Sequence, residues 1–164
     1  MTASAPSSNL VGSFPSREIL LIVGSETGNA EMVADCVTDA LHAVDFKVTT
    51  FRTGTLEDAH LDTHHTVLIC CSTTGIGDLP QNVEPLHDAL VKTRPSLSHL
   101  RYGLIGLGDR NYKESFLGGP KKWDAIFEAL GAVKVGTRLE LDATDNPTPD
   151  LDAVEWVKHW VTLL

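Results

Sequence analysis

Residues 19–30, with the sequence ILLIVGSETGNA, join an apolar run to a polar loop that opens a helical pattern. Five consecutive aliphatic side chains fit a buried strand of a parallel sheet. In a loop between a strand and a helix, the N–H groups of the first helical turn and the helix dipole favour an anion. Ser25, Thr27 and Asn29 add side-chain donors, and the segment contains no Lys or Arg. The stretch therefore predicts an anion site built from neutral hydrogen bonds.

Two further loops stand at the ends of apolar runs. We call residues 25–30 the first loop, residues 72–78 (STTGIGD) the second loop and residues 106–112 (GLGDRNY) the third loop. Loops at the carboxyl ends of parallel strands meet in one crevice, where open α/β sheets bind their ligands. The crevice would offer hydroxyl groups, a flexible glycine turn and one aromatic plate, Tyr112. These features fit a phosphorylated planar ring, although each loop alone also fits an ordinary turn.

Five apolar runs alternate with helical patterns, which is typical of an α/β protein with a parallel sheet and helices on both faces. The runs cover residues 19–23, 46–51, 67–71, 102–107 and 133–141, and we expect each to form one strand. On the first helix we expect a core face made of Val33, Val37, Ala40 and Val44. Asn82 and Thr148 are expected to cap the third and last helices, and Gly131 to end the fourth.

Length and composition fit one domain. The chain has 164 residues, of which 42% are hydrophobic, enough for one sizeable core. We expect residues 1–17, rich in Ser, Ala, Pro and Thr, to be a disordered tail, and residues 18–164 to be a single domain. No run approaches the ~20 apolar residues of a membrane span. Three cysteines are too few for a disulfide framework, so we expect a reducing cytoplasm. We also expect a monomer.

The charge balance favours some partners over others. Twenty-two acidic and 13 basic residues give a net charge of −9, which argues against nucleic acid and anionic membranes. A basic protein surface is the favoured partner, while the charge could equally serve solubility alone. The candidate docking charges are Asp78, Asp109, Glu114, Asp142 and Asp145.

Several other classes of protein lack their motif here. There is no GxxxxGK[ST] of a P-loop kinase or GTPase, no GxGxxG of a dinucleotide site and no GxSxG of a serine hydrolase. His60, His64 and His65 do not have the spacing of a zinc site. We therefore predict neither a metal nor a catalytic residue.

Read together, the three loops resemble those of the flavodoxin family, over residues 18–164. The stretch GSETGNAE at 24–31 is more similar to MioC-like members and to the FMN modules of diflavin reductases than to free-standing flavodoxins. Further similarity lies in PSLS at 95–98 and EWVKHWV at 155–161. The resemblance implies a short-chain, flavodoxin-like, five-stranded parallel sheet in the order 2-1-3-4-5, with FMN as the cofactor.

The resemblance also implies roles for the loops. The first loop would hold the FMN phosphate, with the residues Ser25, Glu26, Thr27, Gly28, Asn29 and Ala30. The flavin ring would be bordered by Ser72, Thr73, Thr74, Gly75, Ile76 and Gly77 on one side, and by Leu107, Gly108, Asp109, Asn111 and Tyr112 on the other. Thr74 stands where relatives often have an aromatic residue. Either Ile76 covers the inner face of the flavin ring instead, or that face is less well stacked. Phe116 stands one position later than the phenylalanine of relatives.

The function implied is that of a low-potential one-electron carrier between a reductase and acceptor proteins, with no substrate of its own. The Gly75 carbonyl could turn toward a ring nitrogen that becomes protonated on reduction, and the new hydrogen bond would contribute roughly 1 kcal/mol. The partners would be basic surfaces of a flavodoxin reductase and of acceptor redox proteins. Two alternatives stay open: a flavin-dependent NAD(P)H quinone or nitro reductase, and a cofactor-free interaction module with the same fold.

Overall fold

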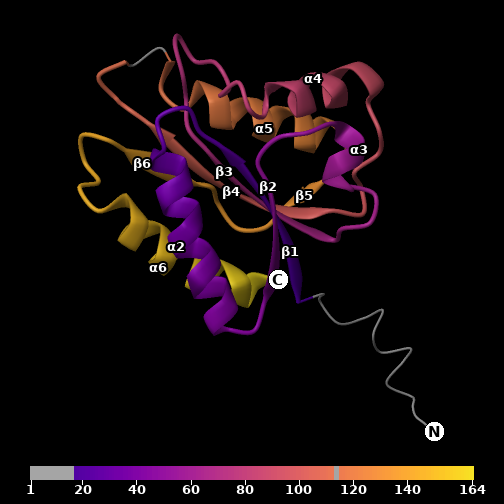
Figure 1. The fold of residues 1–164 in the computed structure, drawn as a ribbon, viewed down its shortest axis with the longest axis horizontal. Helices are drawn as coiled ribbons and strands as arrows, with labels where there is room; N and C mark the ends of the chain where they lie inside the picture. The colour runs from indigo at the N-terminus through magenta and orange to yellow at the C-terminus, as the bar shows by residue number, and fades with distance from the viewer. Residues whose placement is uncertain (1–16, 113–114) are drawn as a thin grey trace, which may run out of the picture.

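A computed structural model describes residues 17–112 and 115–164 (Figure 1). Residues 1–16 of the predicted tail and the docking candidate Glu114 lie outside the described residues. The elements, in order, are β1 (Glu18–Gly24), α2 (Asn29–Ala43), β2 (Lys47–Phe51), α3 (Leu56–Ala59), β3 (Thr66–Cys71), α4 (Glu84–Thr93), β4 (Arg101–Gly108), α5 (Gly118–Ala129), β5 (Val133–Lys134), β6 (Leu139–Asp142), α6 (Pro149–Trp160) and the 3₁₀ turn Val161–Leu163. Arg17, placed in the tail by sequence, stacks on the Phe46 ring with its guanidinium 4.2 Å from the ring centre.

The sheet is parallel and its main path runs β2-β1-β3-β4-β5, which confirms the predicted order. The expectation of one strand over 133–141 is wrong, because two short strands pair with β4 in succession. Arg101 lies opposite Val133, and Ile105 lies opposite Leu139. Between them the chain turns away at Gly136, whose φ is +70°. The sheet therefore has six strands rather than five.

Helices cover both faces of the sheet (Figure 1). On one face, α2 and α6 bury Val33, Val37, Val157 and Trp160 with alternate strand residues. On the other face, α3, α4 and α5 bury a second core that includes Leu86, Leu90, Trp123 and Phe127. The strands alternate between the two, so Cys70 belongs to the α2/α6 core and its neighbour Cys71 to the α4/α5 core. The sheet is thus buried on both faces.

The helix ends agree with the sequence in part. Gly131 follows α5 with φ +98°, as expected of a left-handed C-terminal residue. Thr148 is the N-cap of α6, but its side chain makes no capping hydrogen bond. Asn82 does not cap α4, whose N-cap is Val83, because its amide is used in other contacts. Val44 was expected in the core but is 38% exposed, since α2 already ends at Ala43. None of the described helices is long and apolar enough to cross a membrane.

Candidate functional site

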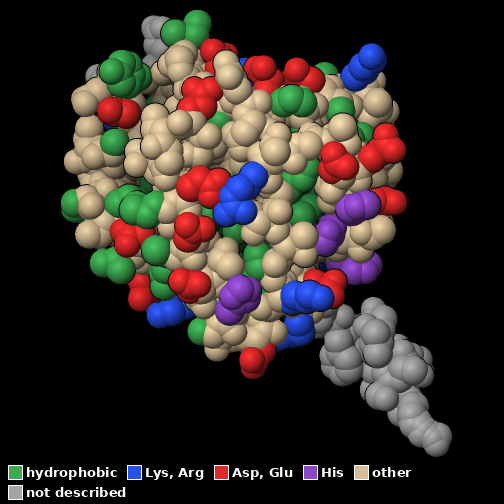
Figure 2. Space-filling view, viewed as in Figure 1, with side chains coloured by type: hydrophobic (Ala, Val, Ile, Leu, Met, Phe, Trp, Pro, Cys, Tyr) green, Lys and Arg blue, Asp and Glu red, His purple; other side chains and the backbone are tan. Residues whose placement is uncertain are grey.

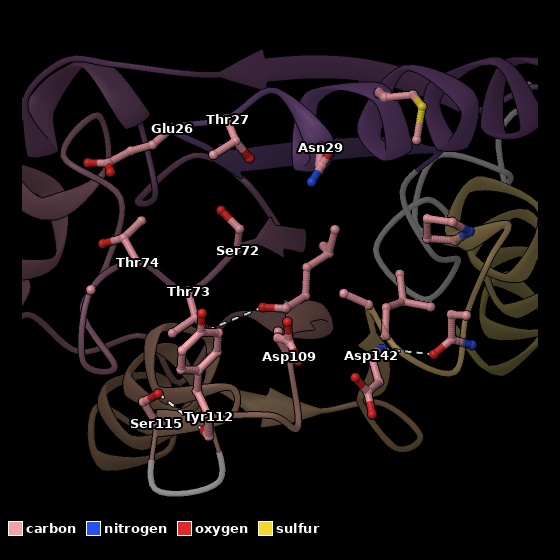
Figure 3. A pocket seen from close by; sticks show the side chains of 18 of the residues that line it. Glu26, Thr27, Asn29, Ser72, Thr73, Thr74, Asp109, Tyr112, Ser115 and Asp142 are labelled. Carbon is pink, nitrogen blue, oxygen red and sulfur yellow. Dashed lines mark hydrogen bonds between the residues drawn. The ribbon is translucent and has the colours of Figure 1, made fainter.

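A pocket of about 740 Å³ opens at the carboxyl ends of β1, β3, β4 and β6 (Figure 3). It brings the three predicted loops together, as the topology requires. Of the residues predicted from sequence, those that line it are Glu26, Thr27, Asn29, Ser72, Thr73, Thr74, Gly75, Leu107, Gly108, Asp109 and Tyr112. In Figure 3, Thr27 comes from the loop before α2 and Asn29 from the first position of α2, while Tyr112 and Ser115 lie across the pocket from them.

Some predicted residues do not line this pocket: Ser25, Gly28, Ala30, Ile76, Gly77 and Asn111. Ala30 is fully buried in the core, whereas Ile76 is 91% exposed. The missed lining residues are Met32, Ser115, Leu141, Asp142, Ala143, Asn146, Pro147 and Pro149. Six of them lie at the end of β6 or between it and the start of α6. The polar residues after Leu141 follow an apolar run, as the other three loops do. This position at the end of a strand could have identified them from the sequence as part of the pocket.

The first loop carries main-chain donors without acceptors. The first hydrogen bond of α2 runs from the N–H of Met32 to the carbonyl of Gly28 at 3.0 Å. Within the described part of the chain, the N–H groups of residues 26, 27, 29, 30 and 31 have no acceptor. The N–H of Gly28 is bound by the Ser25 hydroxyl at 3.0 Å. Such a row of free N–H groups at a helix start is suited to an anion.

The second loop is a closed turn. The N–H groups of Gly77 and Asp78 both donate to the Thr74 carbonyl, at 3.1 and 2.8 Å, and the N–H of Thr74 donates to the Asp78 carbonyl at 2.9 Å. Gly75 and Gly77 have φ of +51° and +101°, which favours glycine. Gly77 is buried, and a Cβ on Gly118 would lie only 2.6 Å from its Cα. The peptide that is free to turn is therefore the exposed one between Gly75 and Ile76.

The hydroxyl groups behind the second loop connect strands to one another. Ser72 donates to the carbonyl of Gly24, and Thr73 to the carbonyl of Leu107, both at 3.2 Å (Figure 3 shows the Thr73 bond). Thr74 donates to the Leu79 carbonyl at 3.3 Å. These side chains fix the floor of the pocket and leave the main chain and the first loop to contact a ligand.

The third loop is anchored by Asp142, whose side chain is 3% exposed. The Asp142 carboxylate accepts the Arg110 N–H at 3.1 Å and pairs with the Arg110 guanidinium at 2.9 Å. Desolvation opposes its ionisation, but hydrogen bonds from Thr144 and Arg110 and the Arg110 charge hold the pKa of Asp142 below its ordinary value of 3.8. The expectation that Asp142 is a docking charge is therefore wrong, because its charge is buried and paired.

The pocket has no cationic side chain among its described lining residues. Arg52 pairs with Glu31 of α2 at 2.9 Å and with Asp35 at 3.6 Å. The charge of Arg52 is thus taken up by two acidic side chains of α2. Tyr112, 67% exposed, supplies an aromatic side chain at the rim. Free main-chain donors at one end and an aromatic side chain at the other fit a phosphorylated, planar cofactor. Among the described residues, no three His, Cys, Asp or Glu side chains come together as a metal site.

These features define an open α/β protein with a nucleotide-type pocket at its strand ends. The family model for flavodoxin matches residues 21–156. The chain is 38% identical to the flavodoxin YqcA and 37% identical to the protein MioC, both of Escherichia coli, over 90% of this chain and 98% of each relative. It is also 37% identical to the sulfite reductase flavoprotein alpha-component of Aliivibrio fischeri, over 91% of this chain and 24% of that protein.

Solved structures agree with this assignment. A mutant flavodoxin from Pseudomonas aeruginosa superposes with a TM-score of 0.82 at 33% identity, and the match covers 90% of this chain and 98% of that one. The chain belongs to the flavodoxin family, as the motifs in the sequence predicted. Its cofactor is FMN, and its class of function is electron transfer.

Proposed function

We propose that this protein is a low-potential carrier that moves single electrons between a reductase and acceptor proteins, with its FMN held in the 740 Å³ pocket. FMN supplies the redox chemistry when bound, since a flavin ring accepts electrons singly. The observation that carries this proposal is the row of acceptor-free N–H groups in the first loop, residues 26–31 apart from Gly28. They provide neutral donors for a phosphate in a pocket without a lysine or arginine among its described lining residues.

The second and third loops would flank the flavin ring. Thr74, Gly75 and Tyr112 all line the pocket, and the flavin ring would lie between the turn of the second loop and the tyrosine. The carbonyl of Gly75 receives no hydrogen bond from the described residues, which leaves it available to a protonated ring nitrogen. Ile76 is 91% exposed and does not line the pocket, so the inner face of the ring would be bordered by Thr74 and the main chain.

The low potential is supported by charge. One carboxylate about 8 Å from a ring, at an effective dielectric constant near 20, disfavours an added electron by about 2 kcal/mol, or roughly 90 mV. Asp109 lines the pocket, and the whole chain carries a net charge of −9. A stacked tyrosine acts in the same direction because it disfavours an electron-rich ring.

The partners would be basic surfaces on a flavodoxin reductase and on redox acceptors. Figure 2 shows acidic side chains spread over one face of the molecule rather than gathered in one place. A net charge of −9 would speed encounter with a basic partner at low ionic strength. We further propose that the domain, residues 18–164, acts as a cytoplasmic monomer, in keeping with its three cysteines, none of them in a disulfide.

The test is a visible spectrum after FMN addition, followed by stepwise photoreduction. A one-electron carrier would bind FMN and take up its two electrons in two separate steps. Steady NADPH oxidation by the purified protein alone would instead support a quinone or nitro reductase. A preparation that leaves the spectrum of added FMN unchanged would support the cofactor-free module.

A further inference from the structure

Asn82, in the turn between β3 and α4, connects three main-chain groups with one side chain. Its Oδ1 accepts the N–H of Ser25 at 3.1 Å. Its Nδ2 donates to the carbonyl of Val23 at 2.7 Å and to that of Arg52 at 2.6 Å. Both donor hydrogens of the amide are therefore used. The side chain joins the end of β1, the beginning of the first loop and the residue after β2.

The same turn contacts the first loop a second time. The N–H of Gln81 donates to the Glu26 carboxylate at 3.2 Å, so this acidic side chain is held at the turn. The end of β1 also packs closely against this turn, because a Cβ on Gly24 would come within 2.8 Å of the Val83 side chain. One side of the first loop thus contacts residues 80–83, while its free N–H groups remain available to a ligand in the pocket.

These contacts determine how the donors are presented. Ser25 gives its N–H to Asn82 rather than to a ligand, which fixes the peptide that precedes the donors of Glu26 and Thr27. A charge is bound more tightly by donors that need no rearrangement, because the cost of ordering them is already met in the free protein. Asn82 itself does not line the pocket.

We propose that Asn82 is a positioning residue, which holds the first loop in the conformation that binds the FMN phosphate without touching the cofactor. The inference rests on the proposed role of the first loop. Its specific consequence concerns the phosphate alone, because the second and third loops, which would hold the ring, make no hydrogen bond to Asn82.

The experiment compares FMN with riboflavin, which lacks the phosphate, on the full chain freed of flavin. The ratio of their dissociation constants measures how much the phosphate contributes. In Asn82→Ala we expect FMN affinity to fall about tenfold or more, since bonds to a charged group depend on each donor's placement, while riboflavin affinity changes less than about twofold. Gln81→Ala is the matched control: the neighbouring side chain is exposed, and its main-chain bond to Glu26 is kept.

Each outcome has one meaning. A ratio near one in the unmodified protein would refute the phosphate role of the first loop, and so the proposed function. A large ratio that is unchanged in Asn82→Ala would overturn the positioning role alone. A fall in both affinities with an unchanged ratio would also overturn it, since that is the mark of general destabilisation. If the alanine variant does not fold, the same ratio is measured on Asn82→Ser, with the same readings.

Discussion

The first loop and the second loop border the same pocket but are held in different ways. In the first loop the main-chain N–H groups of residues 26, 27, 29 and 30 have no acceptor in the described chain, and the loop is held on its other side by Asn82. In the second loop the main chain closes on itself between Thr74 and Asp78, and only the peptide after Gly75 is both exposed and unconstrained. The comparison teaches that the first loop is suited to bind the phosphate charge of the cofactor, whereas the second loop can rearrange when the charge of the flavin ring changes. Affinity should therefore depend on the first loop and redox potential on the ring side.

The strongest test of this division is the double variant Thr27→Leu and Asn29→Leu. Both side chains line the pocket and make no hydrogen bond within the described chain, so they are available to the phosphate. Losing two bonds to a charged group, at roughly 1.5–3 kcal/mol each, should weaken FMN binding at least about 100-fold. Riboflavin binding should change little. Fluorescence titration measures both, with the exposed Thr137→Leu as control; unchanged FMN affinity would show the phosphate site to be wrong.

The next test is Gly118→Ala, which acts on the second loop. The added Cβ would lie 2.6 Å from the Gly77 Cα and 2.7 Å from its oxygen, so the turn must move. Overpacking of this kind costs about 1–3 kcal/mol of the free energy of unfolding. We expect FMN and riboflavin to lose affinity equally, in contrast to the first-loop variant. Urea unfolding and the two titrations check this, and Lys121→Ala, exposed in the same helix, is the control. A loss of FMN affinity without a matching loss of riboflavin affinity would contradict this division of roles between the first and second loops.

A smaller effect is expected from Tyr112→Leu. The side chain is 67% exposed, so stability should stay within about 0.5 kcal/mol. An aromatic stacking contact is worth about 0.5–1.5 kcal/mol, which corresponds to about 20–60 mV for one electron. Because stacking disfavours the electron-rich ring, its removal should raise the potential of the second electron. Spectroelectrochemistry measures the shift. Tyr112→Phe, the control, should keep the original potential. A change in FMN affinity without a change in potential would count against the stacking of Tyr112 on the flavin ring.

The last test is Asp142→Asn, whose loss of stability is fully present at neutral pH and disappears in acid. The pKa of Asp142 is lowered in the folded protein, so ionised Asp142 stabilises the fold above the ordinary value of 3.8. That stability is lost as pH falls from 3.8 through the lower folded pKa. The asparagine variant should show a flatter dependence of the melting temperature on pH in this window. Parallel curves of melting temperature against pH for the two proteins would contradict a stabilising role of the Asp142–Arg110 pair. The control is Asp145→Asn, at an exposed position in the same loop.

The parts of the fold that depend on local pattern could be predicted from the sequence. The strands and the first loop follow from an apolar run that meets a polar helix start, and the carboxyl-end rule then brings the loops together. What escaped prediction depends on contacts between distant residues. Asp142 is buried because Arg110, 32 positions away, pairs with it, and no local signal in the sequence reveals that partner.

The same reason explains two errors in the elements. The strand expected over 133–141 is divided at Gly136, where the Arg138 guanidinium reaches the buried Asp124 at 2.6 Å. Asn82 has the right residue type for a helix cap, yet its amide serves Val23 and Arg52 instead. In both cases a tertiary contact outweighs a local preference of modest size.

The placement of the adjacent cysteines has a practical consequence. Cys70 and Cys71 are fully buried on opposite faces of the sheet, and burial raises the pKa of both thiols, that of Cys71 to about 12. They cannot bridge to one another across the pleat, nor form the thiolate that alkylating reagents attack. Cys36, half-buried on α2, is the thiol that remains accessible. A maleimide dye or spin label should therefore modify the native protein at one place, giving a spectroscopic reporter without any engineered substitution.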